Sequence, residues 1–150
     1  MGYEEIMLVG EYKHTLDKKR RVALPSRFRK ELGKKIILTN GFDKCLFIYP
    51  LSEWKKFSEK LSELPVGQSS TRSINRFMFG GATETDVDSI GRILVPEFLS
   101  RFAELRTKVV MVGVQSRVEV WDEKNWNEYK ERVAKEADTV AEKLGELGVL

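Results

Sequence analysis

The sequence predicts a mainly β fold with flanking helices (α+β), in which two similar repeats form one barrel around a pseudo-twofold axis. The segment LDKKRRVALPSRF at 16–28 recurs as VDSIGRILVPEFL at 87–99. Each copy is followed by short runs rich in β-branched residues, which favour strands, and then by a stretch with the apolar spacing of a helix. Half-units of about 70 residues with such short strands would bury little apolar surface alone, so we expect the two to interlock.

Aligned charged residues define the repeat. Asp17 aligns with Asp88 and Arg21 with Arg92, and each Asp-x-x-x-Arg motif is followed by an apolar run and a proline. Aromatic positions continue to match downstream, so chance similarity of a few apolar residues does not explain the pairing. We therefore divide a single compact domain into a first repeat at 7–64, a connecting segment with a short helix at 65–81, a second repeat at 82–133 and a C-terminal helical extension at 134–150.

The motif of each repeat should begin with a short strand and a helical turn. The apolar runs at 21–24 and 92–95 are followed by Pro25 and Pro96. Proline cannot donate a ladder hydrogen bond but suits the first turn of a helix, so each strand should end there and a helical turn should follow. Gly33 is placed to end the first of these turns with a left-handed cap.

Hairpins should come next in each repeat. The runs at 36–38 and 109–112 are short, apolar and β-branched, which is typical of strands covered on both faces. Asn-Gly at 40–41 and Gln-Ser at 115–116 supply turn residues before the next strands. We therefore expect two antiparallel hairpins, one in each half.

A helix should close each half, capped by Ser52 in the first and by Asp122 in the second, because their side-chain oxygens can accept unpaired amide hydrogens. In the first of these helices the apolar residues lie on one face, which favours core packing over a cofactor or base-stacking site. These residues are Trp54, Phe57, Leu61 and Leu64.

The last helix should run long, from 123 towards the C-terminus, with an apolar seam that repeats every seven residues. The seam consists of Trp126, Val133, Val140 and Leu147, flanked by Ala137 and Leu144. Such a narrow seam fits two arrangements equally well: packing on the chain's own barrel, or contact with a neighbouring subunit. The sequence leaves both open.

Charge is distributed unevenly along the chain. Between Lys13 and Lys35 there are ten bases and two acids, a net +8, so the remainder of a chain with formal charge +3 carries −5. The corresponding part of the second repeat, 83–106, carries −2. Such an asymmetry is expected where one surface meets a polyanion, although a solvated face without a ligand has the same composition.

Other functional classes find little support. Hydrophobic residues at 41% and charged residues at 33% are ordinary for a soluble globular domain, and neither a signal sequence nor an apolar span is present, so we expect a cytoplasmic protein without membrane contact. One cysteine and one histidine exclude an internal disulfide and a Cys/His zinc site. Phosphate-binding, dinucleotide and nucleophile-elbow motifs are missing, so we expect no enzyme, cofactor, metal or small-molecule substrate. Cys45 with His14 is the one nucleophile pair to consider, and the apolar strand after Cys45 favours an inert thiol.

The chain resembles the MraZ family of bacterial transcriptional regulators. The resemblance rests on Gly-Glu-Tyr-Lys-His-Thr-Leu-Asp at 10–17 leading into Arg21, and on the second motif from Asp88 to Pro96. It covers residues 7 to about 133. One departure is Arg20, which stands where the family's first motif usually has glycine; the sequence leaves the conformation of that turn open.

The resemblance implies a swapped-hairpin β-barrel of AbrB/SpoVT-like half-domains, a ring-shaped homo-oligomer, and a nucleoid-associated repressor of the division and cell-wall operon. That repressor would bind double-stranded DNA at short direct repeats in the promoter. Two protein-binding alternatives remain open: an antitoxin-like module, and a regulator of a neighbouring methyltransferase. A disordered interaction tail would mark either one, and the periodic C-terminal helix argues against such a tail.

The resemblance places the DNA-contacting edge on the first motif, with Arg21 essential. Together with the charge pattern, it gives the DNA-binding candidates Lys13, Lys18, Lys19, Arg20, Arg21, Arg27 and Arg29. Asp17 would orient Arg21, because phosphates repel a carboxylate. The alternative role of the Asp-x-x-x-Arg pairs is an ion-pair lattice between the halves, which we expect for Asp88 and Arg92. His14, beside the basic run, is expected to be a spectator rather than a pH sensor.

Overall fold

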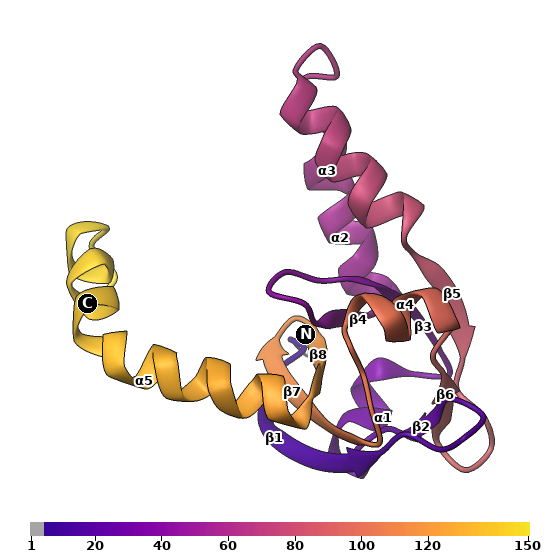
Figure 1. Cartoon of the computed structure of the whole chain (residues 1–150). Helices are drawn as coiled ribbons and strands as arrows, with labels where there is room; N and C mark the ends of the chain where they lie inside the picture. The colour runs from indigo at the N-terminus through magenta and orange to yellow at the C-terminus, as the bar shows by residue number, and fades with distance from the viewer. Residues whose placement is uncertain (1–4) are drawn as a thin grey trace.

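The computed structural model describes residues 5–150 and shows a curved β body from which helices project (Figure 1). The strands are β1 (Leu8–Thr15), β2 (Arg21–Ala23), β3 (Lys35–Asn40), β4 (Leu46–Pro50), β5 (Thr83–Asp86), β6 (Arg92–Leu94), β7 (Lys108–Gln115) and β8 (Val118–Asp122). The helices are α1 (Ser26–Leu32), α2 (Leu51–Ser62), α3 (Ser69–Gly80), α4 (Glu97–Phe102) and α5 (Glu123–Glu146). The mainly β class with flanking helices is therefore confirmed.

The order of the strands confirms both the repeat and its interlocking. An antiparallel sheet runs β1-β7-β8-β4-β3-β5, and β2 pairs with β6 in a separate two-stranded ribbon. The counterparts in the two repeats are β1 and β5, β3 and β7, and β4 and β8. Replacing each strand by its counterpart gives the same order read backwards, as a pseudo-twofold axis between β4 and β8 requires. The repeats also exchange strands, because β1 of the first pairs with β7 of the second and β5 of the second pairs with β3 of the first. Neither repeat completes the sheet by itself.

The β2–β6 ribbon covers the main core. Val22 lies opposite Ile93, and both side chains are buried in one cluster with residues of the six-stranded sheet, including Leu38 and Met111. Neighbouring residues in a strand point to opposite faces, so the residues on either side of this buried pair point outwards. The ribbon therefore has one face in the core and one face that points away from it.

The first hairpin turns differently from the expectation. Asn40 still belongs to β3, and the turn is a longer loop in which Asp43 and Lys44 take the positive φ values of 65° and 61°. Gly41 is needed for another reason: a Cβ there would lie 2.7 Å from ring atoms of Phe47. The Asn-Gly pair was thus correctly placed near a turn but wrongly assigned as the turn itself.

The cap of α2 is also different from the expectation. The helix begins at Leu51, directly after Pro50, and Ser52 lies inside its first turn without capping it. Proline at this point ends β4 and fixes φ at −60°, so no polar side chain is needed to start the helix. The second cap is confirmed, because Asp122 accepts a hydrogen bond from the Asn125 N–H at 3.4 Å.

Aromatic residues at the base of α2 pack into a second core cluster, as expected. Trp54 and Phe57 lie against Tyr49, with ring centroids 5.5 Å from the Tyr49 ring in both cases. Leu64 was wrongly included in this stripe, since it follows the end of α2 and is exposed. Together α2 and α3 form a helical arm that projects from the body (Figure 1).

The long helix α5 leaves the body in another direction (Figure 1). Its first turns pack on the second core cluster through Trp126 and Tyr129, but from Val133 onwards the seam residues Val133, Val140 and Leu147 are exposed. Packing of the whole seam on the chain's own barrel is therefore wrong. Among residues 5–150, no helix combines the length and apolar composition that crossing a bilayer requires.

Candidate nucleic-acid interface

The two Asp-x-x-x-Arg motifs fold into the same loop. In each, the aspartate Oδ1 accepts hydrogen bonds from the backbone N–H groups two and four positions later, at 2.8 and 2.9 Å for Asp17 and at 3.1 and 2.8 Å for Asp88. A short carboxylate side chain thus takes the place of a backbone acceptor and fixes the turn. The sequence forms the loop twice because it supplies this aspartate twice.

The aspartate also holds the arginine of its own motif. Asp17 Oδ2 accepts a hydrogen bond from Arg21 Nε at 3.2 Å, and Asp88 Oδ2 accepts one from Arg92 Nε at 2.8 Å. Each ion pair joins two residues of the same motif, so these pairs do not form a lattice between the halves. In the described part of the chain the terminal nitrogens of both guanidinium groups have no hydrogen-bond partner, which leaves an oriented fork of donors on each arginine.

Both aspartates are held in the charged state. The backbone N–H of Arg21 is the main cause that lowers the pKa of Asp17, and its side chain adds to the effect. The backbone N–H of Arg92 does the same for the pKa of Asp88. Burial opposes the shift in both cases without reversing it. Each motif therefore keeps its carboxylate ionised at neutral pH, and the guanidinium beside it stays oriented.

The missing glycine does not change the first loop. Arg20 takes the left-handed conformation with φ 60°, and Gly91 at the equivalent position has φ 83°. Their N–H groups donate equivalent hydrogen bonds, to the carbonyl oxygens of Asp17 and Asp88, each at 2.9 Å. The Nε of Arg20 is buried and finds no partner among the described residues. The turn is kept, at the cost of backbone strain and an unpaired buried donor.

The two loops lie at opposite ends of the ribbon. Arg21 pairs with Leu94 and Ala23 with Arg92, so the antiparallel register places loop 17–20 at one end and loop 88–91 at the other. We call the outward side of the β2–β6 ribbon together with these two loops the ribbon face.

Helix α1 of the first repeat brings cations to the second loop. Arg29 Nε donates to the Leu24 carbonyl oxygen at 2.9 Å, and the guanidinium of Arg29 fills the space that a Cβ at Gly91 would need. A shallow hollow beside this loop is lined by Arg29, Lys30 and Lys34. First-repeat cations therefore flank both ends of the ribbon face.

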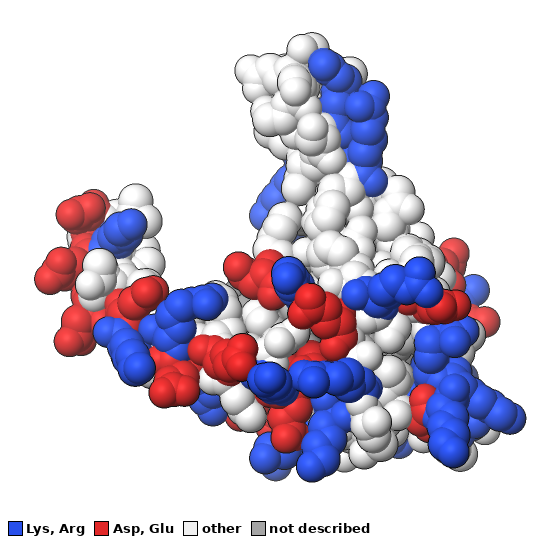
Figure 2. Space-filling model, viewed as in Figure 1, with Lys and Arg blue, Asp and Glu red and all other residues white. Residues whose placement is uncertain are grey.

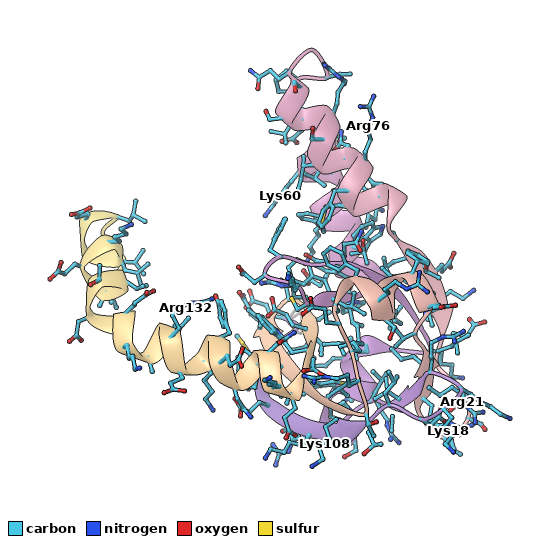
Figure 3. All side chains as sticks on the ribbon, in the orientation of Figure 1. Lys18, Arg21, Lys60, Arg76, Lys108 and Arg132 are labelled. Atoms are coloured by element: carbon cyan, nitrogen blue, oxygen red, sulfur yellow. The ribbon has the colours of Figure 1, made fainter. Side chains whose placement is uncertain are left out.

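Most of the predicted DNA-binding residues border the ribbon face. Lys18 and Arg21 lie close together in Figure 3, in the region where Figure 2 shows a dense group of basic side chains. Lys19 is exposed in the same loop, and Arg27 is exposed on α1. Lys30, which the sequence-based candidates omitted, lies beside the second loop, and its spacing of three residues from Arg27 on one helix was the signal available.

Lys13 lies apart from the other candidates. It is two residues from Glu11 in β1, so the two side chains point to the same side of the strand. Glu11 accepts hydrogen bonds from Trp126 Nε1 at 3.3 Å and from Lys130 Nζ at 3.1 Å. Lys13 therefore lies on the side of β1 that faces α5, not on the ribbon face.

A Cys/His nucleophile pair is not formed. Cys45 directly precedes β4, and β7 and β8 lie between β4 and β1, which carries His14. Three strand spacings amount to roughly 14 Å, well beyond hydrogen-bond reach. Burial raises the pKa of the Cys45 thiol far above its usual value, and burial followed by the Arg29 charge lowers the pKa of His14. Within residues 5–150, no group of acidic, histidine and cysteine residues could hold a metal ion.

Comparisons with known proteins agree on one relationship. A family model described as "MraZ protein, putative antitoxin-like" matches the chain twice, at residues 7–77 and 78–145. The proteins named transcriptional regulator MraZ from Caldicellulosiruptor saccharolyticus and Clostridium acetobutylicum are 48% and 45% identical to it over 143 residues. In Halothermothrix orenii the protein of that name is 42% identical over the same length. Each alignment spans 95% of this chain and 100% of the relative.

Proposed function

Since the chain belongs to the MraZ family, we propose that it is a transcriptional regulator that binds double-stranded DNA through the ribbon face. The names of its relatives support regulation of transcription. One observation supports DNA as the ligand: Arg21 is held at Nε by Asp17, has unengaged terminal nitrogens among the described residues, and lies beside Lys18 in a basic region (Figures 2 and 3).

Phosphate contacts and base contacts would come from different residues of this face. Lys18, Lys19 and Arg27 are exposed cations that would neutralise phosphates, and each contact steepens the salt dependence of binding by about 0.9 in the logarithmic slope. The oriented fork of Arg21 would donate two hydrogen bonds to a guanine in the major groove, which discriminates against other bases by about 1–3 kcal/mol. The lysines thus position the protein, and Arg21 supplies the sequence preference.

The finer parts of the proposal concern assembly and target. One ribbon face contacts few base pairs, so we propose a ring-shaped homo-oligomer whose copies bind short direct repeats in the promoter of the division and cell-wall operon and repress it. Linked copies gain affinity through effective concentration without new contacts. The exposed seam of α5, with Val133, Val140 and Leu147 at intervals of seven residues, supports a subunit contact of coiled-coil type. Such a repressor would act at the nucleoid, in the cytoplasm.

Replacing Arg21 by alanine tests the proposal. We expect the Arg21→Ala variant to lose about 5- to 150-fold in affinity for a promoter duplex, which corresponds to one bidentate base contact, while its sedimentation stays unchanged. Arg76→Ala is a matched control, because Arg76 is also an exposed arginine but lies on α3 in the helical arm, away from the ribbon face (Figure 3). Normal promoter binding by Arg21→Ala would contradict the assignment.

Binding to a protein partner is the second candidate function, and the words "antitoxin-like" in the description of the matching family model favour it. The partner could be a toxin-like protein or a neighbouring methyltransferase. Selection of bound fragments from genomic DNA distinguishes the two functions. Enrichment of promoters with direct repeats supports the regulator, whereas a chain that enriches no sequence but retains a protein partner supports the alternative.

A further inference from the structure

The second motif carries apolar residues where the first carries cations. Ile90 stands at the position equivalent to Lys19, and Phe98 at the position equivalent to Arg27. These two side chains are 60% and 54% exposed, and Leu94 on β6 is 50% exposed. Three large apolar side chains thus remain uncovered around a short ribbon. Isolated exposed apolar residues need no explanation, but three of them beside the face proposed to bind DNA call for one.

Leu94 is the member of this group that lies closest to the proposed DNA contact. It is directly opposite Arg21 in the ribbon, and side chains of directly opposite residues lie on the same face of a sheet. Because Val22 and Ile93 fill the core from the inner face, Arg21 and Leu94 both point outwards. A donor fork and an apolar side chain are therefore neighbours on the ribbon face.

We infer that Leu94 contacts the 5-methyl group of a thymine in the major groove, next to the base that Arg21 recognises, and so determines part of the sequence preference. This inference rests on the proposed DNA-binding function. The major groove accepts a two-stranded β-ribbon, and the thymine methyl is the apolar group that base pairs present there. The second repeat therefore contributes to recognition through an apolar contact, although its own charge is negative.

The charges around Leu94 favour DNA over a protein as its partner. Lys18 and Lys19 are exposed at one end of the ribbon, and Arg27 and Lys30 are exposed beyond the other end. A protein seated on Leu94 would bury the free nitrogens of Arg21 and remove these cations from water, which is costly unless each is paired. A duplex presents phosphates to the cations and an apolar methyl to the leucine, so it satisfies both.

Removal of single methyl groups from the DNA tests the inference. A duplex is first selected from a random library by the wild-type chain, and each thymine is then replaced in turn by deoxyuridine, which lacks only the 5-methyl group. At one position we expect the wild-type chain to bind about fourfold more weakly, as for the loss of one buried methyl group, or about 0.8 kcal/mol. The Leu94→Ala variant should bind the thymine and deoxyuridine duplexes equally well at that position.

Leu51→Ala serves as the matched control, because Leu51 is also an exposed leucine but begins α2, away from the ribbon. This variant should keep the wild-type response to deoxyuridine. The inference is overturned if no thymine position affects the wild-type chain, or if Leu94→Ala still responds fourfold. It is equally overturned if Leu94→Ala changes the sedimentation and leaves the response intact, since Leu94 would then contact protein. Failure of the proposed function shows itself differently, as unchanged DNA binding by Arg21→Ala.

Discussion

Substitutions at the equivalent positions Arg20 and Gly91 should change the stability of the chain in opposite directions. In Arg20→Gly the left-handed backbone strain, about 1–2 kcal/mol, is relieved, and so is the cost of an unpaired buried Nε, about 1–3 kcal/mol. Glycine also raises the conformational entropy of the unfolded chain, which reduces this gain in stability by about 0.5–1 kcal/mol. Taking the lower figures for strain and desolvation, we expect Arg20→Gly to be more stable than the wild-type chain by about 1 kcal/mol.

The opposite effect is expected for Gly91→Ala, which should be destabilising by about 2–3 kcal/mol. Alanine at φ 83° introduces strain of about 1–2 kcal/mol. Its Cβ would also collide with the guanidinium of Arg29 and break the hydrogen bond from Arg29 Nε to the Leu24 carbonyl oxygen, worth about 1 kcal/mol. Because both loops have the same backbone shape, the opposite signs of the two stability changes would arise from the residues at these positions and the side chains around them.

Thermal unfolding measures both effects. For a chain of this size 1 kcal/mol corresponds to a shift in Tm of about 2–4 °C, and all variants must be compared at one protein concentration because self-association raises Tm. Urea unfolding gives an independent free energy. An Arg20→Gly variant that is less stable than the wild-type chain, or a Gly91→Ala variant that is equally stable, would refute this account of the loops.

Two further predictions concern titration. Burial raises the pKa of Asp122, but hydrogen bonds from Arg106 and Asn125 outweigh it and hold the pKa below its usual value. The stabilisation from this carboxylate is complete above a pH of about 4 and is lost as the pH falls below that. In urea titrations, the wild-type chain should therefore lose more stability between pH 5 and 3 than the Asp122→Asn variant. Equal losses would contradict this. Because burial and then Arg29 lower the pKa of His14, the imidazole should be mostly neutral above about pH 6.5. Gel-shift affinity at constant salt should therefore be flat from about pH 7 to 8, and binding that tightens as the pH falls within that range would contradict this.

The duplicated motif made the core of the fold predictable from the sequence. A strand pattern repeated with the same charged residues implies two equivalent halves, and halves of this size bury little apolar surface alone, which favours a shared core. The observed exchange of β1 and β5 between the repeats confirms that reasoning. Local features set by a single contact were less predictable: Asn40 stays in its strand because the turn is made by Asp43 and Lys44.

The candidate site was predictable in composition but not in arrangement. Counting charges identified the basic segment, yet it could not show that α1 of the first repeat lies beside the loop of the second, where Arg29 fills the space next to Gly91. The same count treated Leu94 as part of an acidic, structural half. Its place opposite Arg21 follows from strand register, which depends on how the two halves pair and not on either segment alone.

The exchange of strands also governs how the chain can fold during synthesis. When the first repeat leaves the ribosome, β1 and one edge of β3 lack the partners that β7 and β5 will later supply. Translation adds about 5–20 residues per second, so these backbone edges stay open for seconds while the second repeat is made. Two nascent copies on one messenger RNA could pair their edges with each other during that interval, so domain swapping is the characteristic misfolding hazard of this architecture.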